Sequence, residues 1–144
     1  QEVADNWPDL KGGASDNQFA LFARLLPGFD AIEGVAIETR DAAGKPKRFG
    51  NMMLTRLPVV QVMRPHLPWP ARATNNMTRG LIEAVVMTET GPLRLLNTHL
   101  EYSHPEIRAA QVEASRRIHA EACARTGTPR KDSRATYKVT PSAT

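Results

Sequence analysis

The sequence has little of what identifies many protein classes at once. It holds one cysteine, Cys123, in 144 residues, which excludes an internal disulfide and a metal site made of several cysteines. No apolar run approaches the roughly 18 residues of a membrane helix, and no signal peptide is visible. A cytoplasmic location is therefore the default expectation, although a targeting segment upstream of Gln1 stays open. Neither a Gly-x-Ser-x-Gly elbow nor a glycine-rich phosphate loop is present, which argues against Ser-His-Asp hydrolases and phosphate-loop proteins.

What the chain does have is enough apolar sequence for one folded domain and an unevenly placed positive charge. Its hydrophobic fraction is 41% and its formal net charge is +4. Residues 125–144 hold five basic residues and one acidic residue, whereas residues 1–124 hold fourteen of each. The excess charge therefore lies in a tail that is rich in Ser, Thr and Pro. Such a composition predicts a flexible, solvated segment, and the alternative is an arm that binds an anionic partner.

The first half of the chain predicts one helix followed by strands. Residues 15–28 have a Ser15-x-x-Gln18 capping box, apolar residues at helical spacing and a Pro-Gly stop, so they predict a short helix. Strand-forming residues then alternate with turn formers. A strand, a turn, and a hairpin with a further strand after Pro58 are predicted for residues 29–40, 41–48 and 49–63.

The second half predicts a loop, a hairpin and a longer helix. Residues 64–78 contain three prolines and predict a long surface loop, and residues 80–101 predict a second hairpin. A Ser103-x-x-Glu106 box can cap the helix that follows. One side of this helix carries Ile107, Ala110, Gln111, Ala114 and Ile118. Strands paired by hairpins and covered by helices imply an α/β fold of the α+β kind, with mostly antiparallel sheets.

Polar residues gather where the last predicted strand ends. Because side chains alternate along a strand, one face changes from apolar to polar in the order Leu93, Leu95, Asn97, His99 and Glu101. The Asn97 amide can position a ligand, and His99 can donate to a phosphate oxygen or protonate a leaving oxygen near neutral pH. Such a cluster suits a reaction on an anionic substrate. The alternative, a strand that simply emerges into solvent, is equally compatible with the pattern.

The helix after this strand adds two polar side chains of the same kind. Arg108 offers a planar cationic fork, and Gln111 lies among apolar helix positions, where its amide needs a hydrogen-bond partner. Both can belong to the polar cluster, or both can be surface residues. The other histidines, His66, His104 and His119, have no matching polar neighbours in the sequence and are interpreted as structural or surface residues.

Four segments together resemble a known family. "NTHLEYSHPEIRAAQVE" at residues 97–113 is similar to the His-containing strand and following helix of the endonuclease/exonuclease/phosphatase family. "QEV", "FGNMMLTRLPV" and "TRGLIEAVV" are similar to three of its other strands, in the family's order, at residues 1–3, 49–59 and 78–86. These metal-dependent phosphodiesterases include deoxyribonuclease-like nucleases, sphingomyelinases and inositol-phosphate phosphatases. The resemblance covers most of residues 1–118.

The resemblance implies a four-layer α/β sandwich and a metal-assisted attack on phosphorus at the strand ends. It implies Glu2 as the carboxylate ligand of Mg²⁺ or Mn²⁺, a type of ion that prefers oxygen ligands. His99 would bind or protonate the phosphate ester, and Asn97 would hold its surroundings. The remaining implied residues, which would bind phosphate at the site edge or support the His-bearing strand, are Asn51, Arg79, Arg108 and Gln111. The substrate stays open between nucleic acid, phospholipid head group and sugar phosphate.

The sequence also departs from the family pattern. The family has an Asn-bearing strand upstream, and downstream a "GDFN" strand and an Asp-His pair that activates water, and none of these occurs here. Residues 1–124 are therefore expected to be an incomplete domain of this family, followed by the basic tail 125–144. One hypothesis is a hydrolase whose site is incomplete in this chain. The other is a non-catalytic scaffold of the same fold. Nothing in the sequence indicates an oligomeric state.

Overall fold

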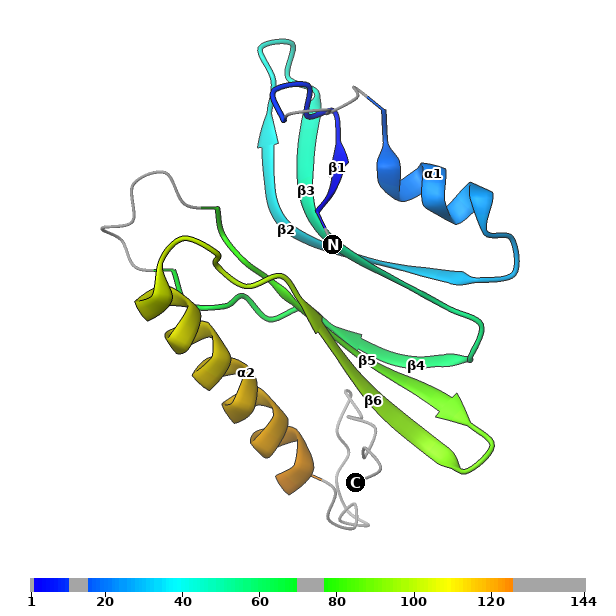
Figure 1. Cartoon of the computed structure of the whole chain (residues 1–144). Helices are drawn as coiled ribbons and strands as arrows, with labels where there is room; N and C mark the ends of the chain where they lie inside the picture. Colours follow the sequence, from blue (N-terminus) through cyan, green and yellow to red (C-terminus); the bar gives the residue numbers. More distant parts are fainter. Residues whose placement is uncertain (1, 11–15, 70–76, 126–144) are drawn as a thin grey trace, which may run out of the picture.

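The computed structural model describes residues 2–10, 16–69 and 77–125 (Figure 1). Its strands form two antiparallel sheets of three strands each, sheet A in the order β1-β3-β2 and sheet B in the order β4-β5-β6. In chain order the elements are β1 (Val3–Asp5), α1 (Gln18–Leu25), β2 (Asp30–Arg40), β3 (Pro46–Thr55), β4 (Val59–Met63), β5 (Leu81–Thr88), β6 (Gly91–Thr98) and α2 (Pro105–Ala124).

Three apolar clusters hold these elements in four layers. Phe19 of α1 packs with Val3 and Met52 on sheet A. Ala114 of α2 packs with Leu81 of sheet B and with Leu67 of the segment between β4 and β5. Between the two sheets lies a cluster of buried Ile32, Ile82 and Ala84. The order is therefore α1, sheet A, sheet B, α2, as Figure 1 shows. The predicted α+β fold with antiparallel sheets under helices is confirmed, and the layers are those of a four-layer sandwich.

Two glycines of sheet A allow close contacts. A Cβ atom added at Gly34 of β2 would overlap the side chain of Ile82 in β5, so glycine at this position lets the backbone of sheet A come against an apolar side chain of sheet B. A Cβ atom added at Gly50 of β3 would overlap the carbonyl oxygen of Gly34 on the neighbouring strand, so this glycine serves the pairing within sheet A.

The start of α1 differs from the predicted capping box. Asn17 caps the helix by accepting from the Ala20 amide at 3.0 Å. Gln18, predicted to bond back to the start of the helix, instead accepts from the Ala4 amide at 2.8 Å and ties α1 to β1. Ser15 lies outside the described residues. The prediction for Gln18 was wrong because a neighbouring strand offers it an amide that a local pattern cannot show.

The start of α2 also differs from its predicted box. The helix begins at Pro105, and its N-cap residue, His104, makes no side-chain cap bond. Ser103 does not cap the helix, because its hydroxyl donates to the buried Glu101 carboxylate at 2.6 Å. A charged acceptor forms the stronger hydrogen bond. On the predicted apolar side, Ala110 is exposed, whereas Ile107 and Ala114 are buried and Gln111 is fully buried.

Two strand boundaries differ from the sequence predictions. The turn predicted for residues 41–48 is shorter, since β3 already begins at Pro46 and pairs with β2. The last strand, predicted to continue to Glu101, ends at Thr98, so the alternation of faces does not extend to His99. Leu93, predicted to face the core, is 45% exposed because β6 is the outer strand of sheet B.

No helix within the described part of the chain is long and apolar enough to cross a membrane. The basic tail after Arg125, and part of the predicted loop at residues 70–76, lie outside the described residues. The flexibility predicted for the tail therefore stays a prediction.

Candidate functional site

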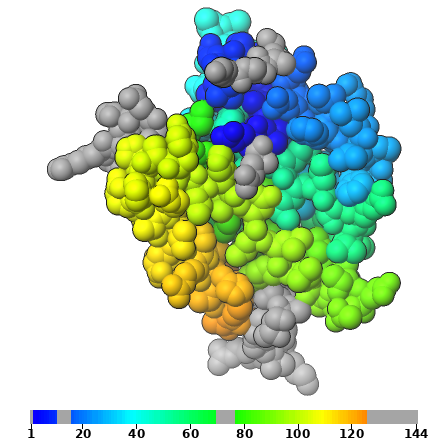
Figure 2. All heavy atoms as spheres, in the orientation of Figure 1, coloured from blue at the N-terminus to red at the C-terminus, as the bar shows by residue number. Residues whose placement is uncertain are grey.

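Two residues from different sheets meet at the predicted site. Glu2 precedes β1 of sheet A, and His99 follows β6 of sheet B. A Glu2 carboxylate oxygen, Oε1, lies 3.4 Å from His99 Nδ1. Figure 2 shows the dark blue N-terminal residues beside the yellow-green residues at the end of β6. The structure thus brings together the predicted metal ligand and the predicted catalytic histidine, although 97 positions of sequence separate them.

Arg79 approaches the same histidine from inside the protein. It is 5% exposed, and its Nη1 lies 3.4 Å from His99 Nδ1. Its backbone is fixed beside the end of β6, because its carbonyl accepts from the Leu67 amide and the next carbonyl, that of Gly80, accepts from the Thr98 hydroxyl. A guanidinium can only donate, so Arg79 needs Nδ1 as an acceptor, whereas the Glu2 carboxylate, 3.4 Å from the same nitrogen, needs it as a donor. The tautomer of His99 therefore decides which of the two side chains the ring bonds to.

Glu101 is the site residue that sequence analysis did not assign. The carboxylate is 2% exposed, and its Oε2 lies 4.0 Å from Arg79 Nη2. Its other oxygen accepts from the Ser103 hydroxyl at 2.6 Å and from the Ser103 amide at 2.8 Å. Chiefly the Ser103 hydroxyl, helped by the Ser103 amide and His104, lowers the pKa of Glu101 to about 2, against the opposing effect of burial. Glu101 is therefore a permanent negative charge beside Arg79.

Two residues of α2 hold the segment that follows His99. Gln111, 1% exposed, accepts from the Glu101 amide through Oε1 at 2.8 Å and donates to the Pro68 carbonyl at 3.2 Å. Arg108 donates to the carbonyl oxygens of Glu101 and Tyr102, each at 2.9 Å. Both side chains bond to the backbone after the histidine and neither reaches the histidine itself. The signal for Gln111 was its place among apolar helix positions.

The two predicted asparagines lie between the sheets, away from the ring. Asn97 donates weakly to the Met52 carbonyl at 3.5 Å, and its buried Oδ1 has no hydrogen-bond partner. Asn51 is buried in β3, next to Met52. Among the described residues, no hydrogen bond or ion pair joins Asn51 to His99, Arg79 or Glu2. The structure therefore brings Asn97 to the sheet interface but does not bring Asn51 to the histidine.

A second group of polar residues beside the site has the composition of a catalytic triad but not its geometry. Ser103 Oγ lies 3.1 Å from His104 Nδ1 and 2.6 Å from the Glu101 carboxylate, and the same Nδ1 lies 3.6 Å from Glu101. In a triad the acid and the hydroxyl bind opposite nitrogens of the ring. Here they share one nitrogen, and the hydroxyl donates directly to the acid. This group stabilises a turn and does not activate Ser103.

The residues at the site can supply a metal ion with few protein ligands, so water or substrate would have to supply the others. Within the described ranges, no group of three or more His, Cys, Asp and Glu side chains could hold a metal ion. Glu2 nevertheless offers a carboxylate that is 59% exposed, and Mg²⁺ is commonly bound by one or two carboxylates, with waters and substrate phosphates completing the shell. Glu2 therefore fits a site with a single protein carboxylate.

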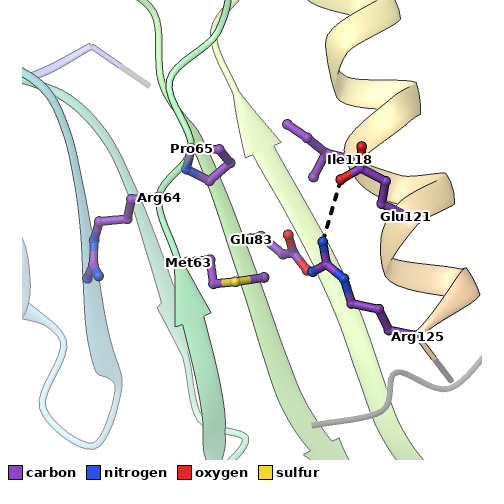
Figure 3. Close-up of a pocket in the computed structure, with 7 residues that line it drawn as sticks. All are labelled: Met63, Arg64, Pro65, Glu83, Ile118, Glu121 and Arg125. Carbon is purple, nitrogen blue, oxygen red and sulfur yellow. Dashed lines mark hydrogen bonds and ion pairs between the residues drawn. The ribbon is translucent and has the colours of Figure 1, made fainter. Parts of the chain in front are cut away.

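A cavity of about 380 Å³ lies apart from these residues, between β4, β5 and the end of α2 (Figure 3). Glu83 is at its inner side, where it pairs with Arg94 at 2.6 Å. None of the predicted site residues lines this cavity, which is bounded by Met63, Arg64, Pro65, Glu83, Ile118, Glu121 and Arg125.

Comparison with protein-family models, curated proteins and solved structures finds no match to this chain. The family resemblance of the four segments therefore stays a prediction, and the chemistry of the site has to be argued from its geometry.

Proposed function

We propose that the chain carries part of the site of a metal-dependent phosphodiesterase or phosphatase. One observation supports this most. The Arg79 guanidinium is buried, and among the described residues the two acceptors that its Nη atoms approach are both distant, His99 Nδ1 at 3.4 Å and Glu101 Oε2 at 4.0 Å. Short charge-assisted hydrogen bonds of about 2.7–2.9 Å are the norm for such a group. Its unused donors, next to a histidine and an exposed carboxylate, suit the oxygens of a phosphate ester.

Each residue then has a defined role. Arg79 binds a phosphate oxygen. In the tautomer in which Nδ1 accepts from Arg79, the His99 proton is on Nε2, from which it can be donated to the ester or to its leaving oxygen. Glu2 is the residue that would hold Mg²⁺ or Mn²⁺. When bound, such an ion neutralises the phosphate and the charge that develops on it. Arg108 and Gln111 keep the histidine-bearing segment in place through its backbone.

A non-catalytic phosphate-binding scaffold is the second candidate, and one observation favours it. Hydrolysis needs a group that orients water, and Glu101, the carboxylate nearest to Arg79 among the described residues, is already bonded to Ser103. A scaffold of this kind would bind a phosphate ester through Arg79 and His99 without cleaving it.

The decisive experiment is hydrolysis of bis-(p-nitrophenyl) phosphate by this chain and by a version extended to its complete reading frame. Each is assayed with Mg²⁺ and with chelator. Metal-dependent turnover in either version supports the hydrolase, and silence of both under all conditions favours the scaffold. In the active version, His99→Ala should lower turnover about 100-fold or more while the unfolding midpoint changes little. The control is His119→Ala, an exposed histidine of α2. Equal losses of turnover and fold would make His99 structural.

A further inference from the structure

We propose that Glu101 is a positioning residue, whose buried carboxylate holds the Arg79 guanidinium toward His99 and keeps it ready for an anionic ligand. The consequence for turnover rests on the proposed function, whereas the placement of Arg79 does not. Sequence analysis placed Glu101 on the polar face of a strand and assigned it no role. The structure instead places it beyond the strand, against the guanidinium.

The first reason is the charge of Arg79. A guanidinium stays protonated in proteins, and a buried cation needs a counter-charge. Among the described residues, Glu101 is the one carboxylate that forms an ion pair with Arg79. Because Oε2 of Glu101 faces Nη2 of Arg79, the opposite nitrogen, Nη1, is directed at His99. The position of the acid therefore decides which guanidinium nitrogen meets the histidine.

The second reason is that Glu101 cannot move closer. Its Oε1 is held by the amide and hydroxyl of Ser103, its own amide donates to Gln111, and its carbonyl accepts from Arg108. A carboxylate with one oxygen bonded to Ser103, on a backbone that Gln111 and Arg108 also hold, attracts Arg79 from 4.0 Å and does not form a short bidentate pair with it. The guanidinium is thus oriented, but its donors stay available for a ligand. This explains why α2 bonds so closely to the backbone around Glu101.

The third reason is the presence of a competing acid. Glu2 is 3.4 Å from the same His99 nitrogen that Arg79 approaches. Without the charge of Glu101, Glu2 is the remaining carboxylate near the ring, and Arg79 would be attracted outward to it. It would then cover His99 and occupy the carboxylate that is proposed to hold the metal. Glu101 keeps the two charged side chains on opposite sides of the histidine.

The test uses the full chain and the variant Glu101→Gln, with Glu106→Gln as the control. Glu106 is an exposed acid in the first turn of α2, five residues further along the chain. The first readout is the ¹H–¹⁵N signal of the Arg79 side-chain Nε–H, identified by its loss in Arg79→Lys. The second is the affinity for inorganic phosphate in the absence of metal. Thermal unfolding is recorded in parallel.

We expect Glu101→Gln to shift or broaden the Arg79 signal and to weaken phosphate binding about tenfold, while Glu106→Gln changes neither. The proposal is overturned if Glu101→Gln has the wild-type Arg79 signal and the wild-type phosphate affinity, and only its unfolding midpoint is lowered. Glu101 would then be a stabiliser of the Ser103 turn. Should Glu101→Gln fail to fold, Glu101→Asp keeps the charge but retracts it by one methylene. A shifted Arg79 signal in that variant supports the proposal, and an unchanged one overturns it.

The outcome is separable from that of the proposed function. If no hydrolysis is found but Glu101→Gln alters the Arg79 signal, the hydrolase proposal fails and the positioning role stands. If hydrolysis is found and Glu101→Gln leaves both the Arg79 signal and the phosphate affinity unchanged, the positioning role fails alone. If the wild-type chain binds no phosphate, the proposal is judged by the Arg79 signal of Glu101→Gln alone. A shifted or broadened signal supports it, and an unchanged signal overturns it.

Discussion

Sheet B is associated with two buried Arg–Glu pairs of nearly equal burial and very different geometry. Arg94 and Glu83 have side chains 7% and 3% exposed and lie 2.6 Å apart. Arg79 and Glu101 have side chains 6% and 2% exposed and lie 4.0 Å apart. Within the described part of the chain, each arginine also has an Nε without a hydrogen-bond partner. Burial and the unpartnered Nε are thus common to both pairs. The pairs differ in the distance between the guanidinium and the carboxylate, which is short in the first pair and long in the second.

The difference follows from where each pair lies in the sheet. Glu83 and Arg94 are on adjacent paired strands, two positions apart in register, so sheet pairing brings their side chains together. Glu101 lies beyond the end of β6, where no register applies, and its carboxylate is held by Ser103. The first pair is complete within the protein. The second has donor capacity left over beside a histidine, which is what a binding site requires.

The largest effect is expected from breaking the complete pair. Arg94→Met leaves Glu83 charged, buried and unpartnered, so the free energy of unfolding should fall by about 3–5 kcal/mol. Arg79→Met should cost less, about 1–2 kcal/mol, because Glu101 keeps its hydrogen bonds to Ser103. Chemical denaturation of both variants measures the difference. Equal losses would show that the two pairs contribute alike, and Glu83→Leu combined with Arg94→Met should restore most of the stability.

An effect of intermediate size is expected from acid. The folded-state pKa of Glu101 is about 2, against an ordinary value of 4.5. Because its pKa is lowered by folding, Glu101 contributes stability that is fully present above pH 4.5 and is lost as the pH falls toward 2. The contribution is about 3 kcal/mol at most. The measurement is the unfolding free energy of the wild type and of Glu101→Gln between pH 6 and pH 2. Parallel curves would show that Glu101 is not an acid-sensitive stabiliser.

The smallest effect on stability is expected at the exposed end of the cluster. Glu2→Gln removes a carboxylate that is 59% exposed, so the free energy of unfolding should change by less than about 0.5 kcal/mol. The same variant should weaken the Mg²⁺ dependence of hydrolysis in whichever version of the chain is active. Glu38→Gln, which removes an exposed acid paired with Arg40, is the control. An unchanged response to Mg²⁺ in Glu2→Gln would remove Glu2 from the ligand set.

The sequence predicted most of the regular elements because their signals are local. The hairpin predicted within residues 49–63 was wrong, because β3 pairs in sheet A and β4 in sheet B, and such pairing depends on distant strands. β2 and the hairpin of β5 and β6 follow from strand-forming residues between turn formers, and α2 follows from its spacing of apolar residues. The capping box of α1 failed because Gln18 bonds to a strand 14 residues away, about which a local pattern contains no information. The box of α2 failed for a local reason, because Ser103 donates to the carboxylate of Glu101 two residues before it.

The candidate site was predictable in part. His99 was named from the polar end of a predicted strand, Glu2 and Arg79 were named from the resemblance, and the structure places the three together. Glu101 was missed because alternation was extended three residues past the end of β6, which placed Glu101 on the same face as His99. Its significance depends on a turn at Ser103 and on a contact with Arg79, and neither can be read from the spacing of residues along the chain.

The close approach at Gly34 has a consequence for chemistry. Glu2 is carried by one sheet and His99 by the other, so the gap across which they meet depends on the thickness of the apolar layer between the sheets. At Gly34 the backbone of one sheet lies directly against the Ile82 side chain of the other. We expect Gly34→Ala to push against that side chain, and where Ile82 does not give way, the added methyl group acts as a spacer between the sheets. An apolar contact in the middle of the protein could in this way alter a distance between two charged groups at its surface.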